Sequence, residues 1–136
     1  MHATESHAAF VERAYEEARS LLIETRDYIA GPSAAESRAL EPADRLRLTM
    51  ELARLTRRLT EATAWLMLQK GVAAGEISRT EAQSTDAARL EAESEPESDP
   101  ISLARLPITV RALIDRTRRL HLHVVALQRS VAGAVG

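Results

Sequence analysis

Apolar residues recur along the chain at steps of three and four positions, the spacing that places side chains on one face of an α-helix. This pattern predicts three long amphipathic helices, over residues 5–30, 43–74 and 107–132. It is clearest in the second helix, at Leu48, Leu52, Leu55, Leu59, Ala62, Leu66 and Gln69. We therefore expect one face of this long central helix to lie in a hydrophobic core.

The width of the apolar stripes indicates how much of each helix surface is covered by the rest of the protein. Trp65, Leu68 and Val72 form a second stripe beside the first, so we expect the central helix to be covered on more than one side. The first helix has its stripe at Phe10, Ala14, Leu21, Thr25 and Tyr28, widened by Val11, Ala18, Leu22 and Ile29. The third helix has its stripe at Val110, Leu113, Thr117, Leu120, Val124, Leu127 and Val131.

Glycine, proline and capping residues separate these helices. Gly31 and Pro32 end the first helix, with Gly31 expected in a left-handed cap conformation. Pro42 suits the first turn of the second helix. Ser78 and Glu81 have the spacing of a capping box, which predicts a short further helix over residues 79–90.

Residues 33–41 are expected to form a short connection or a single helical turn. Residues 91–100 read Glu-Ala-Glu-Ser-Glu-Pro-Glu-Ser-Asp-Pro, and their charge and prolines predict a mobile acidic loop. Pro107 then opens the third helix. The fold class predicted is all-α: an antiparallel three-helix bundle with a long central helix and an acidic loop before the third helix, forming one domain over residues 1–136.

The composition agrees with this class. Among 136 residues there are 5 Gly and 5 Pro, too few for the turns of a many-stranded β-protein, and aromatic residues make up only 3 %. No cysteine is present, which excludes disulfides and thiol chemistry. No secretory signal or membrane-spanning run is recognisable, so we expect a soluble, cytoplasmic protein without a membrane role.

Charge is distributed unevenly along the chain. Residues 1–41 carry a net charge of −4, residues 42–75 of +3, residues 76–100 of −6 and residues 101–136 of +5. Acidic and basic segments therefore alternate. This alternation favours antiparallel packing of unlike neighbours and provides surfaces that can attract a charged partner.

No motif for catalysis, a cofactor or a metal is present. His121 and His123 stand about 200° apart around a helix and cannot hold one metal ion from one face, so we expect one of them to be partly buried and the other exposed. The chain contains no phosphate-binding glycine loop and no nucleophile elbow. We therefore expect no enzyme, no cofactor and no metal site.

The arginines are the remaining candidates. Those proposed as a protein-docking surface are Arg54, Arg57, Arg58, Arg111 and Arg118. The alternative is a solvated face on which much of this charge is neutralised within its own helix. Nucleic acid is disfavoured, because the isoelectric point is about 6.1 and no recognition helix is visible.

Three stretches of the sequence resemble the RcdA family, the alphaproteobacterial regulators of CtrA degradation. They are residues 22–32, which close the first helix, residues 47–78 with the pattern LT-R-L…A-WL…Q…GE, and residues 106–121 with LP…LIDR…LH. The resemblance implies a dimeric three-helix bundle without catalytic activity. It also implies an accessory adaptor that helps the ClpXP protease to degrade the cell-cycle regulator CtrA.

The partners implied are thus protease-adaptor components and a response-regulator substrate. The alternative is a structural or scaffolding bundle without a link to proteolysis, since related proteins can keep a fold while their partners change. For the homodimer, the candidate interface is the apolar group of Trp65, Leu66, Met67 and Leu68. The competing interpretation places Trp65 in the core.

Overall fold

The computed structural model describes residues 2–84 and 97–135, and it is all-helical, as predicted, with no strand among these residues. Three long helices dominate: α1 (His2–Ala30), α3 (Pro42–Ala73) and α6 (Ile108–Val135). Three short helices lie in the connections: α2 (Ser33–Arg38), α4 (Arg79–Gln83) and α5 (Pro100–Ala104). The long helices begin and end within three residues of the predicted bounds.

Local chemistry explains where the helices begin and end. Pro42 occupies the first turn of α3, where its missing N–H is not needed. Ser78 caps the start of α4, as predicted, because its hydroxyl oxygen accepts a hydrogen bond from the Glu81 N–H at 3.0 Å. The predicted 79–90 helix is too long, because α4 ends at Gln83 with Ser84 as its C-cap. Positions 85–90 of that prediction, and positions 91–96 of the acidic loop, lie outside the described residues.

Two expectations about the connections are wrong. Gly31 does not take the left-handed conformation; among the described glycines only Gly75 does, with φ of 75° just after α3. The predicted acidic loop ends too late at residue 100, because α5 begins at Pro100 and Asp99 caps this helix by accepting a hydrogen bond from the Ile101 N–H.

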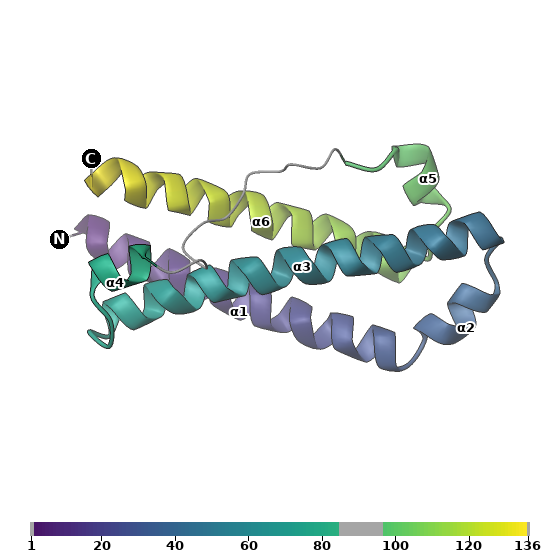
Figure 1. Cartoon of the computed structure of the whole chain (residues 1–136), viewed down its shortest axis with the longest axis horizontal. Coiled ribbons are helices and arrows are strands. Elements are labelled where there is room, and N and C mark those ends of the chain that lie inside the picture. The colour runs from purple at the N-terminus through teal and green to yellow at the C-terminus, as the bar shows by residue number, and fades with distance from the viewer. Residues whose placement is uncertain (1, 85–96, 136) are drawn as a thin grey trace.

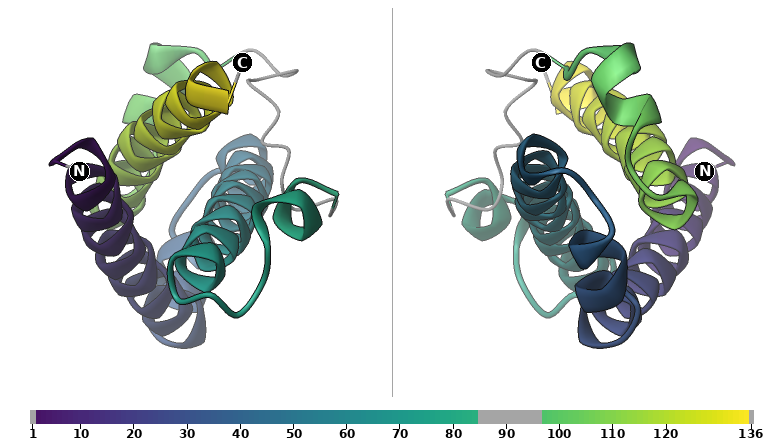
Figure 2. Two further views of the ribbon diagram at one scale, coloured as in Figure 1. Left: turned by 90° about the vertical axis from the view of Figure 1, so that its left-hand side faces the viewer. Right: turned by 90° about the vertical axis from the view of Figure 1, so that its right-hand side faces the viewer.

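Each long helix packs against the other two, around a common interior (Figures 1 and 2). α1 runs antiparallel to both neighbours, but α3 and α6 run in the same direction (Figure 1). One ion pair agrees with these directions: Arg105, just before α6, pairs with Asp44 near the start of α3. The prediction of an antiparallel arrangement is therefore wrong for α3 and α6. The physical reason is that the connection between α3 and α6 is long enough to return along the whole molecule.

The core is aliphatic and follows the predicted stripes closely. The residues that are almost completely buried include Leu21, Leu48, Leu59, Leu66, Val110 and Val124. Thr25 and Thr117 are also buried, at the positions the stripes give them. Phe10 and Ile29 depart from the prediction, since both are more than two-fifths exposed. The Phe10 ring instead lies beneath the Arg13 guanidinium, 4.8 Å from its carbon.

Truncation of Leu59 should show how much stability this core provides. Leu59→Ala removes a fully buried side chain from the middle of α3, and we expect the free energy of unfolding to fall by about 2–5 kcal/mol. Leu46→Ala is the matched control, because Leu46 lies on the same helix with its side chain mostly in solvent. Its expected effect is below about 0.5 kcal/mol. Equal losses in urea unfolding would contradict the placement of α3.

Candidate docking surface on α3 and α6

Two opposite charges are buried in α3, seven residues apart. Glu51 is 4 % exposed and Arg58 is 7 % exposed. Together with Leu55, Ala62 and Trp65 they form a stripe of buried residues at steps of four and three. Burying an ionised group is costly unless it is paired and hydrogen-bonded. Both side chains therefore need partners from outside the stripe.

The segment that leads back towards α6 supplies those partners. Arg58 donates a 2.8 Å hydrogen bond to a carboxylate oxygen of Glu97. The adjacent Ser98 hydroxyl donates a hydrogen bond to the Glu51 carboxylate. Two consecutive residues thus form hydrogen bonds with both buried side chains of α3. This pairing fixes the segment against the helix.

Two further arginines surround Glu97. Arg54 on α3 lies 3.9 Å from Glu97 and 3.9 Å from Glu51. Arg118 on α6 lies 3.9 Å from Glu97 and its side chain is 50 % exposed. We call Arg54, Arg58 and Arg118 the arginine cluster. It joins α3 to α6 through one carboxylate.

The cluster changes the acidity of Glu97. Burial is the largest single influence and raises the pKa of the Glu97 carboxyl. The hydrogen bond and charge of Arg58, with the charges of Arg118 and Arg54, outweigh burial and leave this pKa below its ordinary value. Glu97 is therefore ionised at neutral pH.

Beyond Glu97, the segment follows α3 towards its beginning. Glu97 lies at Arg58, Ser98 lies at Glu51, and Arg105 lies at Asp44 with Nε 3.2 Å from a carboxylate oxygen. The residue numbers rise along the segment as they fall along α3. This path brings the chain to the same end of the molecule as the start of α3, where α6 begins.

The other predicted docking residues have different surroundings. Arg57 and Arg111 are exposed. Arg111 donates from Nε to the Leu106 carbonyl at 3.1 Å. Asp115 forms an ion pair with Arg119, four residues later in the same helix, as the alternative of charge neutralised within a helix expects. Of the five candidates, three thus meet at Glu97, and two lie at the surface outside the cluster.

The predicted dimer residues divide between core and surface. Trp65 and Leu66 are buried within the single chain, which is where the competing interpretation places Trp65. Met67 is 57 % exposed, and Leu68 is partly exposed. The physical reason is that α3 packs against both α1 and α6, which covers Trp65 and Leu66, whereas Met67 stays at the surface.

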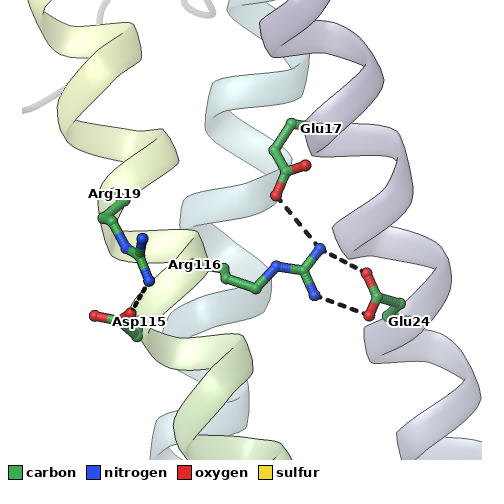
Figure 3. A network of polar contacts seen from close by, with 5 residues as sticks. All are labelled: Glu17, Glu24, Asp115, Arg116 and Arg119. Carbon is green, nitrogen blue, oxygen red and sulfur yellow. Dashed lines mark hydrogen bonds and ion pairs between the residues drawn. The ribbon is translucent and has the colours of Figure 1, made fainter.

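A second polar network joins α6 to α1 (Figure 3). Arg116 donates two hydrogen bonds of 2.8 Å to the two carboxylate oxygens of Glu24, and a third of 3.4 Å to Glu17. The hydrogen bond from Arg116 is the main cause that lowers the pKa of Glu24. Lys70 of α3 pairs in the same way with Glu12 of α1, at 3.1 Å. The predicted attraction between acidic and basic segments is thus present.

The structure offers few features for chemistry. In residues 2–84 and 97–135, no group of three or more His, Asp or Glu side chains is placed to hold a metal ion. His121 is buried and His123 is exposed, as the sequence predicts. Among the described helices, none has both the length and the apolar character needed to cross a membrane.

The sequence analysis missed the partners of the arginine cluster. Glu51 and Arg58 stand at a core spacing in the sequence, seven residues apart and with Leu55 between them. That signal indicates two buried charges that need partners. It does not indicate that Glu97 and Ser98 provide them, because only the return path of the chain brings these residues to α3.

The pair of Arg116 and Glu24 provides a test of the packing of α1 against α6. In a double-mutant cycle with Arg116→Ala and Glu24→Gln, we expect a coupling energy of up to about 1 kcal/mol at pH 7, because both side chains are partly exposed. The folded-state pKa of Glu24 is lowered, so this contribution is complete above the unfolded pKa near 4.3 and is lost as pH falls through the folded value.

A cycle on Arg26 and Asp27 is the control, because this ion pair joins neighbours within α1 and is mostly exposed. Its coupling should be near zero. Equal coupling in both cycles, or no loss of the Arg116 coupling in acid, would show that the pair does not hold α6 to α1.

Comparison with known proteins places these features in a family. The sequence pattern of the proteins of unknown function named DUF1465 matches residues 2–135. The crystal structure of RcdA from Caulobacter crescentus CB15 superposes with a TM-score of 0.70 at 29 % sequence identity, covering 89 % of each chain. No curated protein sequence matches significantly. The resemblance to RcdA is thus confirmed, and the chain belongs to the DUF1465 family, whose members are described as proteins of unknown function.

Proposed function

We propose that this protein is a non-enzymatic adaptor in regulated proteolysis that helps ClpXP to degrade a response regulator similar to CtrA. The observation that carries the proposal is the similarity to RcdA over 89 % of both chains. The family pattern, which matches residues 2–135, spans all three long helices. An adaptor needs docking faces rather than a reactive centre.

The described surface is consistent with that role. The interior is formed mainly by aliphatic side chains, and the charged networks join helices to one another. Arg57 on α3 and Arg111 on α6 are both exposed. We propose these two residues, together with the exposed edge of Arg118, as the part of the surface that partners reach first.

Reconstituted proteolysis tests the function directly. We expect degradation of purified CtrA by ClpXP, with the other adaptor components of the same organism, to be faster when this protein is added. A ClpXP substrate that needs no adaptor should be degraded at an unchanged rate. If the CtrA rate does not change, and no protease component co-purifies from the native host, the scaffolding alternative is correct.

The docking residues are tested in the same assay. Arg57→Glu combined with Arg111→Glu should reduce the stimulation, since both substitutions reverse exposed charges. Arg129→Glu reverses an exposed charge near the end of α6 and serves as the control. Equal stimulation by both variants would remove Arg57 and Arg111 from the docking surface.

We further propose that the protein is a homodimer, with Met67 and Leu68 in the interface. Met67→Glu should convert a dimer into a monomer in sedimentation at micromolar concentration without loss of helix content. Met50→Glu is the control, because Met50 is 59 % exposed, close to the 57 % of Met67, and lies near the opposite end of α3. A wild-type monomer would contradict the dimer, and dissociation by both variants would contradict this interface.

A further inference from the structure

We propose that the arginine cluster is a carboxylate-binding surface for an acidic segment of a partner protein, and that Glu97 occupies this surface as an internal competitor. Arg54, Arg58 and Arg118 come from two helices and converge on one carboxylate. The chain itself therefore shows which chemical group the cluster binds. The partner is recognised by the same group.

Arg118, the most exposed arginine of the cluster, forms only a long contact with Glu97. The Arg118 Nε lies 3.9 Å from Glu97, beyond hydrogen-bond distance, and this is the one ion pair of Arg118 among the described residues. A guanidinium presents five N–H donors in a fork that fits both oxygens of a carboxylate. Arg118 therefore has donors and an exposed edge to offer a second carboxylate.

Arg116, two residues earlier on α6, is an arginine of the same molecule that does form short hydrogen bonds with a carboxylate. It binds both oxygens of Glu24 at 2.8 Å and reaches Glu17 as well (Figure 3). Arg116 thus forms a completed structural contact. Arg118 points its charge at the Glu97 carboxylate without such a contact.

Glu97 holds its place by few short contacts. Among the described residues, its one hydrogen bond is the 2.8 Å bond from Arg58, while Arg54 and Arg118 both lie at 3.9 Å. Its side chain is 31 % exposed. A partner carboxylate that binds two of these arginines in bidentate fashion would gain more than Glu97 does, so exchange is physically reasonable.

The charges at the cluster favour an acidic peptide. Among the described residues, Arg118 has no ion pair other than the one with Glu97, so displacement of Glu97 leaves the Arg118 charge to be met by a partner carboxylate. Arg58 is almost fully buried, and a carboxylate beside it stabilises its charge. A nucleic acid fits less well, because the buried Glu51 carboxylate lies within 3.9 Å of Arg54.

This inference deepens the proposed function, because it names the chemistry of the docking partner. Only the identity of the partner rests on that function, since carboxylate binding can be measured without the protease. If binding fails while the protein still accelerates degradation, only the present inference is wrong. If binding succeeds without accelerated degradation, only the proposed function is wrong.

The experiment measures binding of a fluorescent hexaglutamate peptide to the full chain by anisotropy at low salt. We expect weak binding to the wild type and about tenfold tighter binding to Glu97→Gln, since removal of an internal competitor raises the competent fraction. Arg118→Ala should abolish the binding, and Arg118→Lys should retain part of it. Hexaglutamine is the probe control.

Two variants are matched controls. Glu76→Gln removes an exposed carboxylate in the connection after α3, and Arg119→Ala removes an exposed arginine next to Arg118. Neither should change binding of hexaglutamate. Helix content and the urea midpoint are measured for every variant, and because Arg118 is half exposed, loss of binding in Arg118→Ala with an unchanged midpoint supports the proposal.

Three results would overturn it. The first is equal affinity of Glu97→Gln and wild type for hexaglutamate. The second is an equal loss of binding in Arg118→Ala and Arg119→Ala, which would indicate general charge attraction. The third is tighter binding of a single-stranded oligonucleotide than of hexaglutamate, which would assign the cluster to nucleic acid.

Discussion

The arrangement of this molecule depends on two opposite charges buried in one helix. Glu51 and Arg58 lie within the stripe of α3 that also contributes Leu55, Ala62 and Trp65 to the interior. Apolar neighbours cannot satisfy them. Glu97 and Ser98 form hydrogen bonds with both side chains, and these bonds fix where the chain passes on its way to α6. A requirement of α3 alone thus determines the position of a segment far away in the sequence.

The direction of α6 follows from the same path. The described part of the segment after Glu97 runs along α3 towards the start of that helix, where Arg105 meets Asp44. α6 then has to run back in the direction of α3 (Figure 1). This direction places Arg118 at the level of Arg58, so that three arginines from two helices surround one carboxylate. With α6 reversed, Arg118 and Arg58 would not share Glu97.

Sequence periodicity was sufficient for the long helices and most of the core, because a stripe such as Leu48, Leu55 and Leu59 is a local property of one helix. Periodicity could not predict the direction of α6, since the spacing of apolar residues is the same whether a helix runs parallel or antiparallel to its neighbour. The acidic run was interpreted from composition as a solvated loop, yet Glu97 binds Arg58. Two interpretations were open for Trp65, a dimer interface and the core, and only its burial between neighbouring helices distinguishes them.

The contact between Glu97 and Arg58 also bears on chain entropy. Arg116 and Glu24 are separated by 92 residues, and Arg105 and Asp44 by 61, whereas Glu97 and Arg58 are only 39 apart. Closing a loop costs more entropy as it lengthens, though slowly. Once Glu97 binds α3, the remaining span to α6 is short, and the helix is held near its site. The contact between Glu97 and Arg58 thus replaces one long loop closure between α3 and α6 by two shorter ones.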